Sequence, residues 1–340
     1  MIRYDNFLAT IDREEWKPVS RKEIHRKEWW AFRLGRLDWL EGLGRTIHRV
    51  DFATGTVGAF AVVPQLVQPE VLDNVVRRLS FWAKALSRGM RSLWTDVDGT
   101  IVVADVFGVY RLGPDGNVLA HITSENFSDI HSALPGRDGK HLLIANTGTE
   151  EILEVDWSGH VVERIAMHEV FGTGPAAEQD RIIRGCPDRR LIPIDHSKQI
   201  YHVNWARFVG GSDRMLVSCH TPGTVSMLRR GTNGHWTVEW QRGYFPHCHC
   251  PDLDEERGVF YVPVSRTDEV RAVDLATGRT LWVASGIRYG KATSINGPGH
   301  VVVGDCNGKR LVELDRTTGT VAREVALPGI PYGICPVPSR

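Results

Sequence analysis

The chain has 340 residues, of which 42% are hydrophobic and 24% charged, so it can bury a substantial core in one large domain or two ordinary ones. Lys plus Arg and Asp plus Glu both total 41, and this balance argues against the broad electrostatic attraction that nucleic acids or anionic membranes need. This argues for a small-molecule or protein partner, and of these we expect a small-molecule substrate; we expect no nucleic acid and no membrane, and the sequence leaves the oligomeric state open.

The N-terminal stretch "MIRYDNFLATIDREEWKPVS" carries acidic residues early and has no continuous apolar run, so it does not resemble a secretory signal. No later segment is long and apolar enough to span a bilayer. The cysteines are scattered through a large chain, which favours reduced thiols over a disulfide framework. These features predict a cytoplasmic protein.

A repeated strand–turn–strand pattern runs along the chain. Short apolar runs end in a polar turn with glycine and then resume, as in "HRVDFATGTVGAF", "VYRLGPDGNVLAHI", "ILEVDWSGHVVERI", "SMLRRGTNGHWTVEW", "VRAVDLATGRTLWVA" and "LVELDRTTGTVAREV". Three of the intervals between these turns are close to the roughly 40–50 residues of a four-stranded propeller blade, and two are longer. Five of the turns follow another hairpin, so each unit reads as one blade of a β-propeller.

The two ends of the repeat are incomplete in complementary ways. The first turn has no hairpin before it, and after the last turn only "GIPYGICPVP" remains. We expect this C-terminal segment to form the innermost strand of a blade whose outer strands come from "WWAFRLGR" and "TIHRVDFATGTVGAFAV". The sequence thus predicts one all-β domain over residues 1–340: a six-bladed β-propeller closed by its terminal strands, with an N-terminal extension over 1–28.

Two insertions separate the blades. Residues 65–90 have apolar residues at helical spacing and predict a helix, and residues 167–200 predict a mixed loop and helix. Both precede an inner strand, so both are expected on the same face of the ring. This makes them candidate lids.

Histidines gather at the beginnings of the predicted inner strands, which converge on the central channel. His131, His202 and His247 are expected at corresponding positions in three consecutive blades. His220 falls on a connection at the same face, and His249 would point the same way as His247 along its strand. These five are the candidate metal ligands.

Neutral imidazole suits a divalent transition metal, namely iron, copper, zinc or manganese. Tyr201, Tyr244 and Asp195 are expected near the mouth of the channel and are candidates for proton transfer. For each histidine the alternative is a hydrogen-bonded structural role.

The stretch "FPHCHCPD" places Cys248 and Cys250 beside two of these histidines. A zinc clip would need a second pair of ligands at matching spacing, so we expect the two cysteines to pack between blades as small hydrophobic residues.

The segments "GIPYGICPVP", "VDLATGRTLWVA" and "LDRTTGTVAREVALPG" resemble those of the six-bladed propeller superfamily that includes the gluconolactonase and regucalcin-like enzymes and the NHL, YVTN and quinoprotein-like repeats. "IDHSKQIYHVNWARF" is similar to an arylsulfotransferase-like pattern in which a central His precedes Asn by two, here His202 and Asn204. The resemblance implies the fold. It also implies, for the gluconolactonase-like members, a metal held by Glu, Asn and Asp, where this chain offers histidines instead.

Three functions remain open at this point. The first is a metal-dependent enzyme acting on a small molecule at the mouth of the channel: an oxidoreductase with iron or copper, which we favour, or a hydrolase or lyase with zinc or manganese. The second is a non-catalytic propeller that binds a protein, with "EWWAFRLGRLDWL" as a candidate surface. The third is metal-free acid–base or nucleophilic catalysis by His202 with Asp195 or Asp129.

Overall fold

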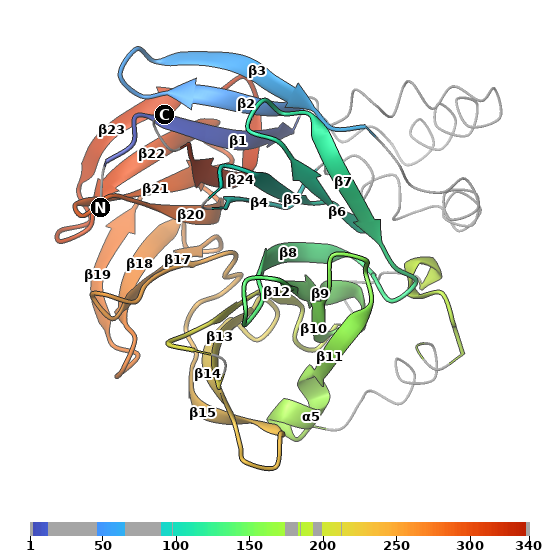
Figure 1. Ribbon diagram of the computed structural model, residues 1–340. Coiled ribbons are helices and arrows are strands. Elements are labelled where there is room, and N and C mark those ends of the chain that lie inside the picture. The colour runs from blue at the N-terminus through green and yellow to red at the C-terminus, as the bar shows by residue number, and fades with distance from the viewer. Residues whose placement is uncertain are drawn as a thin grey trace, which may run out of the picture.

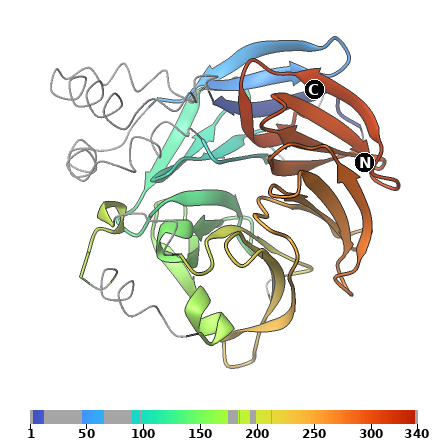
Figure 2. The same ribbon diagram turned by 180° about the vertical axis from the view of Figure 1, so that it is seen from behind.

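A computed structural model describes residues 3–12, 46–64, 90–96, 98–173, 183, 185–192, 199–211 and 213–337. In this part of the chain six four-stranded antiparallel sheets form a ring (Figure 1), and the view from behind shows the same closed arrangement (Figure 2). The predicted six-bladed β-propeller is confirmed.

Five blades are each built from four strands that are consecutive in the chain. The first two comprise β4 (Ser92–Thr95), β5 (Ile101–Ala104), β6 (Gly108–Leu112) and β7 (Val118–Thr123), then β8 (Ile130–Pro135), β9 (Leu142–Asn146), β10 (Glu151–Val155) and β11 (Val161–Ala166). The third comprises β12 (Val203–Phe208), β13 (Arg214–Cys219), β14 (Thr224–Arg230) and β15 (Trp236–Arg242). The last two comprise β16 (Asp252–Asp254), β17 (Val259–Val264), β18 (Glu269–Asp274) and β19 (Thr280–Ser285), then β20 (Gly290–Asn296), β21 (His300–Asp305), β22 (Arg310–Asp315) and β23 (Val321–Ala326).

The sixth blade closes the ring by joining the two ends of the chain. Its strand order is β24 (Ile330–Pro336), β1 (Asn6–Asp12), β2 (Thr46–Asp51) and β3 (Thr56–Val62). The innermost strand is the predicted C-terminal segment. The prediction of "WWAFRLGR" as the second strand was wrong, because β1 pairs with both β24 and β2; residues 29–36 lie outside the described residues.

The strand β1 falls within the expected extension 1–28, so part of that segment belongs to the ring. Its run "NFLATI" lacks the alternation of a half-exposed strand because both of its faces are covered: Phe7 and Leu8, which point to opposite faces, are both buried. A short buried run of this kind is hard to distinguish from a loop by periodicity.

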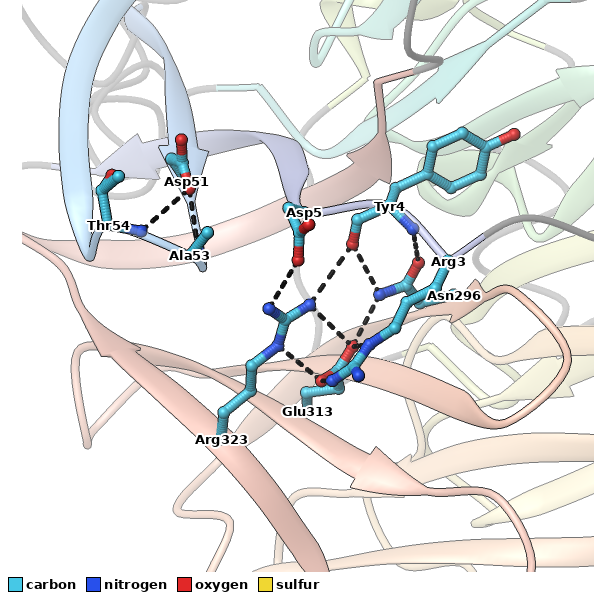
Figure 3. A network of polar contacts seen from close by, with 9 residues as sticks. All are labelled: Arg3, Tyr4, Asp5, Asp51, Ala53, Thr54, Asn296, Glu313 and Arg323. Atoms are coloured by element: carbon cyan, nitrogen blue, oxygen red, sulfur yellow. Dashed lines mark hydrogen bonds and ion pairs between the residues drawn. The ribbon is translucent and has the colours of Figure 1, made fainter.

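The residues before β1 bind the neighbouring blade (Figure 3). The backbone N–H of Tyr4 donates to Asn296 Oδ1 at 2.6 Å, and Asn296 Nδ2 donates back to the Tyr4 carbonyl at 2.9 Å. The carboxylate of Glu313, fully buried in β22, accepts from Arg3 and Arg323. Burial alone would raise the pKa of Glu313, but these hydrogen bonds outweigh it and lower the pKa.

The core lies between blades, so inner and middle strands are buried on both faces while outer strands are partly exposed. The two middle strands β9 and β17 are buried along their whole length, which explains their continuous apolar runs "LLIAN" and "VFYVPV". The predicted turn glycines all adopt positive φ, which a residue without a Cβ reaches at little cost: Gly55, Gly116, Gly159, Gly234, Gly278 and Gly319.

Of the two insertions, residues 65–89 lie outside the described residues, and so does the helix expected there. The second insertion contains α5 (Met167–Phe171), which packs against β11 and β15 (Figures 1 and 2), and the short helix η2 (Arg189–Leu191). A further short helix, η1 (Thr147–Thr149), connects β9 to β10. The role of the insertions as lids remains a prediction.

Within the described ranges, no helix is long and apolar enough to cross a membrane.

Candidate functional site

At one face of the ring, the residue before an inner strand adopts the same unusual backbone conformation in four consecutive blades. The pairs Ile130↔Asn146, Val203↔Cys219, Cys248↔Val264 and Gly290↔Asp305 are structurally equivalent. The residues preceding them have left-handed φ values: Asp129 at 48°, His202 at 47°, His247 at 56° and Tyr289 at 58°. A residue with a Cβ occupies this region at a cost of about 1–2 kcal/mol, so the surrounding structure must impose it.

The same pairs correct the expected register of the histidines. His202 and His247 are equivalent, as predicted, but their counterpart in the β8–β11 blade is Asp129, not His131. His131 lies two residues further along and is equivalent to Asn204, His249 and, in the next blade, Lys291. Ile130, Val203 and Cys248 each lie 16 residues before their strand partners, so an equal count back from the ends of the second strands, which only the structure locates, selects Asp129 rather than His131.

All five candidate histidines line one cavity of about 670 Å³, which we call the histidine cavity. Its lining residues are Arg91, His131, His202, His220, Thr221, His247, His249, Tyr289, Lys291, Cys306, Asn307, Ile330 and Tyr332. The inner strands and the connections from second to third strands supply them, at the face that the topology predicts. The volume is typical of a small-molecule site.

His220 stands at the centre of the cluster. Its ring centre lies 4.7 Å from that of His202, 4.4 Å from that of His247 and 5.0 Å from that of His249. The His131 ring adds a fourth contact of 5.0 Å, to His202. Five imidazoles from three blades thus form one connected cluster, joined through His202 and His220.

Two residues orient His202. Glu150, buried on the β9–β10 connection, accepts the backbone N–H groups of Tyr201 at 2.5 Å and His202 at 3.2 Å. Gln199 Nε2 donates to the Thr147 carbonyl at 2.9 Å, which directs Gln199 Oε1 at His202 Nδ1. Because a carbonyl oxygen only accepts, Nδ1 carries the ring proton, and in the neutral ring Nε2 is the unprotonated nitrogen.

His249 is buried, with 4% exposed, the same fraction as His202. Its Nδ1 is 3.1 Å from Asn204 Nδ2, and its Nε2 is 3.0 Å from Lys291 Nζ. Burial lowers the pKa of His249 well below the usual value, and the nearby charge of Lys291 lowers it further. The pKa of His247 is also lowered, first by burial and then by Arg266 and Lys291. Both rings are therefore neutral near pH 7.

His131 is held by a buried ion pair. Arg91 Nη2 donates to Asp129 Oδ1 at 3.0 Å, Arg91 Nη1 lies 2.7 Å from His131 Nε2, and Asp129 Oδ2 lies 3.4 Å from the same nitrogen. Because an arginine only donates, Nε2 of His131 acts as an acceptor toward it. Nε2 of His131 is therefore already in contact with the Arg91–Asp129 pair.

The donor atoms do not converge as around a bound ion. Throughout the described ranges, no group of three or more His, Cys, Asp or Glu side chains is placed to hold one metal ion. The spacings from His220 to His202 and His247, 4.7 and 4.4 Å between ring centres, are near the roughly 5 Å at which imidazoles stand on one tetrahedral zinc, given Zn–N bonds of about 2.0–2.1 Å.

Comparison with known proteins supports the architecture. No family model and no curated protein matches the chain. Among solved structures, a nidogen/laminin complex aligns with a TM-score of 0.60 at 12% identity, covering 98% of this chain and 99% of that one. A protein of unknown function from Bacteroides caccae has the same TM-score at 14% identity, covering 99% and 100%. Virginiamycin B lyase from Staphylococcus aureus aligns with a TM-score of 0.52 at 9% identity, covering 86% and 81%.

The chain is a β-propeller. Identities of this order show the fold alone, so the resemblance to the six-bladed propeller superfamily holds for the architecture.

Two of the three residues predicted for proton transfer, Tyr201 and Tyr244, do not line the cavity. Tyr201 stacks on Phe171 at 5.1 Å between ring centres, and its hydroxyl contacts Thr173. The side chain of Tyr244 is 90% exposed. Neither lines the histidine cavity, and Asp195 lies outside the described residues. This placement gives no support to proton transfer by either tyrosine.

The sequence reasoning missed several cavity residues. Lys291 and Arg91 supply the cationic side chains of the wall, and Cys306 and Asn307 come from the β21–β22 connection. Lys291 could have been predicted from the sequence, because it occupies the same position in its blade as His249 does in the preceding one. Tyr332, on the closing strand β24, also lines the cavity.

The two cysteines of "FPHCHCPD" separate from its histidines as the alternation predicts. Cys248 is fully buried among apolar residues of the β12–β15 and β16–β19 blades, and Cys250 packs against the same cluster. Burial raises the pKa of both thiols to about 12. Their predicted packing role is confirmed.

Proposed function

We propose that this protein is a metal-dependent enzyme that acts on a small molecule in the histidine cavity. The observation that carries the proposal is the position of His220, whose ring contacts those of His202, His247 and His249. Single histidines on a channel wall are ordinary, but imidazoles packed against one another are costly unless they are neutral. Neutral imidazole is the form that binds a transition metal.

His202, His220 and His247 are the proposed ligands. Gln199 supports this choice because it assigns the proton of His202 to Nδ1, as carbonyl and carboxylate groups do beside metal-binding histidines. The lowered pKa of His247 keeps that ring ready to bind near neutral pH. His131 and His249 flank the site, since Arg91 and Lys291 already contact their ring nitrogens.

The identity of the metal selects the reaction. Iron or copper would make the protein an oxidoreductase, whereas zinc or manganese would make it a hydrolase or lyase by activating water or polarising a carbonyl. We favour the redox metals because the proposed ligands are all nitrogen atoms. The lyases among the structural neighbours keep the second class open.

Two alternatives receive less support. A non-catalytic binding propeller is expected to lack polar convergence at its channel, and five histidines converge here. Metal-free acid–base catalysis has a specific pair in its favour, Asp129 beside His131, but Arg91 shares that carboxylate and opposes protonation of the ring. The proposed partner of His202, Asp195, is outside the described residues.

Elemental analysis tests the proposal directly. Protein purified without added metal should contain stoichiometric Fe, Cu, Zn or Mn, and His202→Ala, His220→Ala and His247→Ala should each lose most of it. His235→Ala, an exposed histidine in the β14–β15 hairpin, is the matched control and should keep it. Circular dichroism checks that each variant is folded. Metal-free wild type that also fails to take up any of the four ions, or full retention by all three cavity variants, would refute the proposal.

A further inference from the structure

The wall of the histidine cavity carries positive charge. Arg91 and Lys291 line it together with the five histidines, and within the described residues no Asp or Glu does. Behind the wall, the fully buried Asp129 pairs with Arg91 and offsets part of its charge, and Glu150 is buried beneath the backbone of His202. A half-enclosed cavity lined by one sign of charge concentrates small ions of the opposite sign.

The charge is not uniform around the wall. Lys291 Nζ lies 4.6 Å from the ring centre of Tyr289 and 5.5 Å from that of Tyr332, and it contacts His249 Nε2 at 3.0 Å. Ile330 lies on the same side, at the start of β24. An ammonium group therefore stands beside an aromatic and aliphatic surface, between β20 and β24.

The backbones of Tyr289 and Tyr332 are held in place by different contacts. Tyr289 has left-handed φ, and its N–H is held by Asp268 Oδ1 at 3.0 Å. Tyr332 belongs to the strand that closes the ring. Because both backbones are fixed, the rings and the ammonium group are pre-arranged, which reduces the entropy lost when a ligand binds.

We infer that the substrate of this cavity is an anionic small molecule whose carboxylate or phosphate oxygens bind Lys291 and whose apolar body lies over Tyr289, Tyr332 and Ile330. The inference rests on the proposed function in that it names the substrate class of the same cavity. It does not depend on the metal, because none of these four residues is a proposed ligand. The volume of about 670 Å³ limits the ligand to the size of an ordinary metabolite.

Isothermal titration calorimetry on chelator-treated protein tests the inference. Phenylphosphonate and benzoate are the anionic probes, and benzyl alcohol is the neutral probe of similar shape. Wild type should bind at least one anion and bind benzyl alcohol at least tenfold more weakly. Lys291→Met, which keeps the length and removes the charge, should weaken anion binding by about 10- to 100-fold. Lys140→Met, an exposed lysine beside β9, should change it less than twofold.

The outcomes separate cleanly. Tighter phenylphosphonate assigns the cavity to phosphate esters, and tighter benzoate assigns it to carboxylates. Equal binding of benzyl alcohol, no binding of either anion to wild type, or unchanged affinity in Lys291→Met would overturn the inference. If Lys291→Met fails to fold, Lys291→Arg should retain binding, and its loss would count against the inference. Failure of the metal analysis alone would leave this result intact.

Discussion

Replacing Arg323 with methionine should destabilise the propeller strongly, because the buried carboxylate of Glu313 would then lack one of its cationic partners. Glu313 is 0% exposed and accepts from Arg323 Nε at 2.6 Å and Nη2 at 3.2 Å. Arg3 and Asn296 supply its other hydrogen bonds. Removing one partner of a buried charged pair costs about 3–5 kcal/mol, since the desolvated carboxylate remains.

The size of the thermal shift follows from the length of the chain. Unfolding entropy of about 2.1 cal/mol/K per residue gives roughly 0.7 kcal/mol/K for a 340-residue domain, so 3–5 kcal/mol corresponds to roughly 4–7 °C in Tm. Differential scanning calorimetry at pH 7 measures this. The pKa of Glu313 is lowered from 4.5 in the folded protein, so the wild-type advantage is present above that pH and is lost as the pH falls through the lowered pKa.

An exposed arginine with the same geometry provides the control. Arg214 donates to both oxygens of Glu239 at 3.0 and 2.9 Å, but on the surface. Arg214→Met should therefore cost at most about 1 kcal/mol. The double variant Arg323→Met, Glu313→Leu should recover part of the loss, because it removes the buried charge as well. Equal effects of Arg323→Met and Arg214→Met would refute the argument from burial.

Three further predictions concern the histidine cavity. His247→Gly should be more stable than His247→Ala by about 0.5–1 kcal/mol in urea unfolding, because the strain of a left-handed φ of 56° that glycine relieves exceeds the entropy that glycine loses on folding. The reverse order of stability would contradict the argument that the surrounding structure imposes this φ. The pKa of His249 is below 6.5 in the folded state, so the unfolded chain binds more protons and the stability falls as the pH drops below about 6.5. In chelator-treated protein, His249→Asn should flatten the dependence of stability on pH between pH 7.5 and 5.5. An unchanged slope would mean that other groups cause this dependence. Gln199→Ala should weaken metal binding by about 10- to 100-fold in chelator competition, because His202 loses the hydrogen bond that orients its ring. Replacement of the exposed Gln241 by alanine is the control and should leave the metal affinity unchanged. Equal metal affinities of the two variants would exclude an orienting role for Gln199.

The repeating turns were sufficient to predict the architecture. Each hairpin carries a glycine that adopts positive φ, and the incomplete ends of the repeat indicated closure by β24. The partner strand was misassigned because a strand buried on both faces, such as Asn6–Asp12, has no period of two to recognise. Burial of this kind is a property of the assembled ring, not of the local segment.

The candidate site was predictable in kind but not in detail. Five histidines at one face followed from the topology of a blade, and all five line the cavity. The position of Tyr201 could not be predicted in this way: it lies one residue before His202, but its side chain packs against α5 and not in the cavity. Residues adjacent in the sequence can point to different sides of the backbone, as Tyr201 and His202 do here.

By itself, the sequence determined which residues could form strands and turns, how many blades the chain contains, and which residue types meet near the axis. Those features depend on periodicity and turn chemistry, which act over a few residues. Only the tertiary structure decided that Asp129 rather than His131 matches His202, that His220 is the central ring, and that Lys291 stands between two tyrosines. These depend on loop lengths, left-handed residues and contacts between blades, which join segments far apart in the chain.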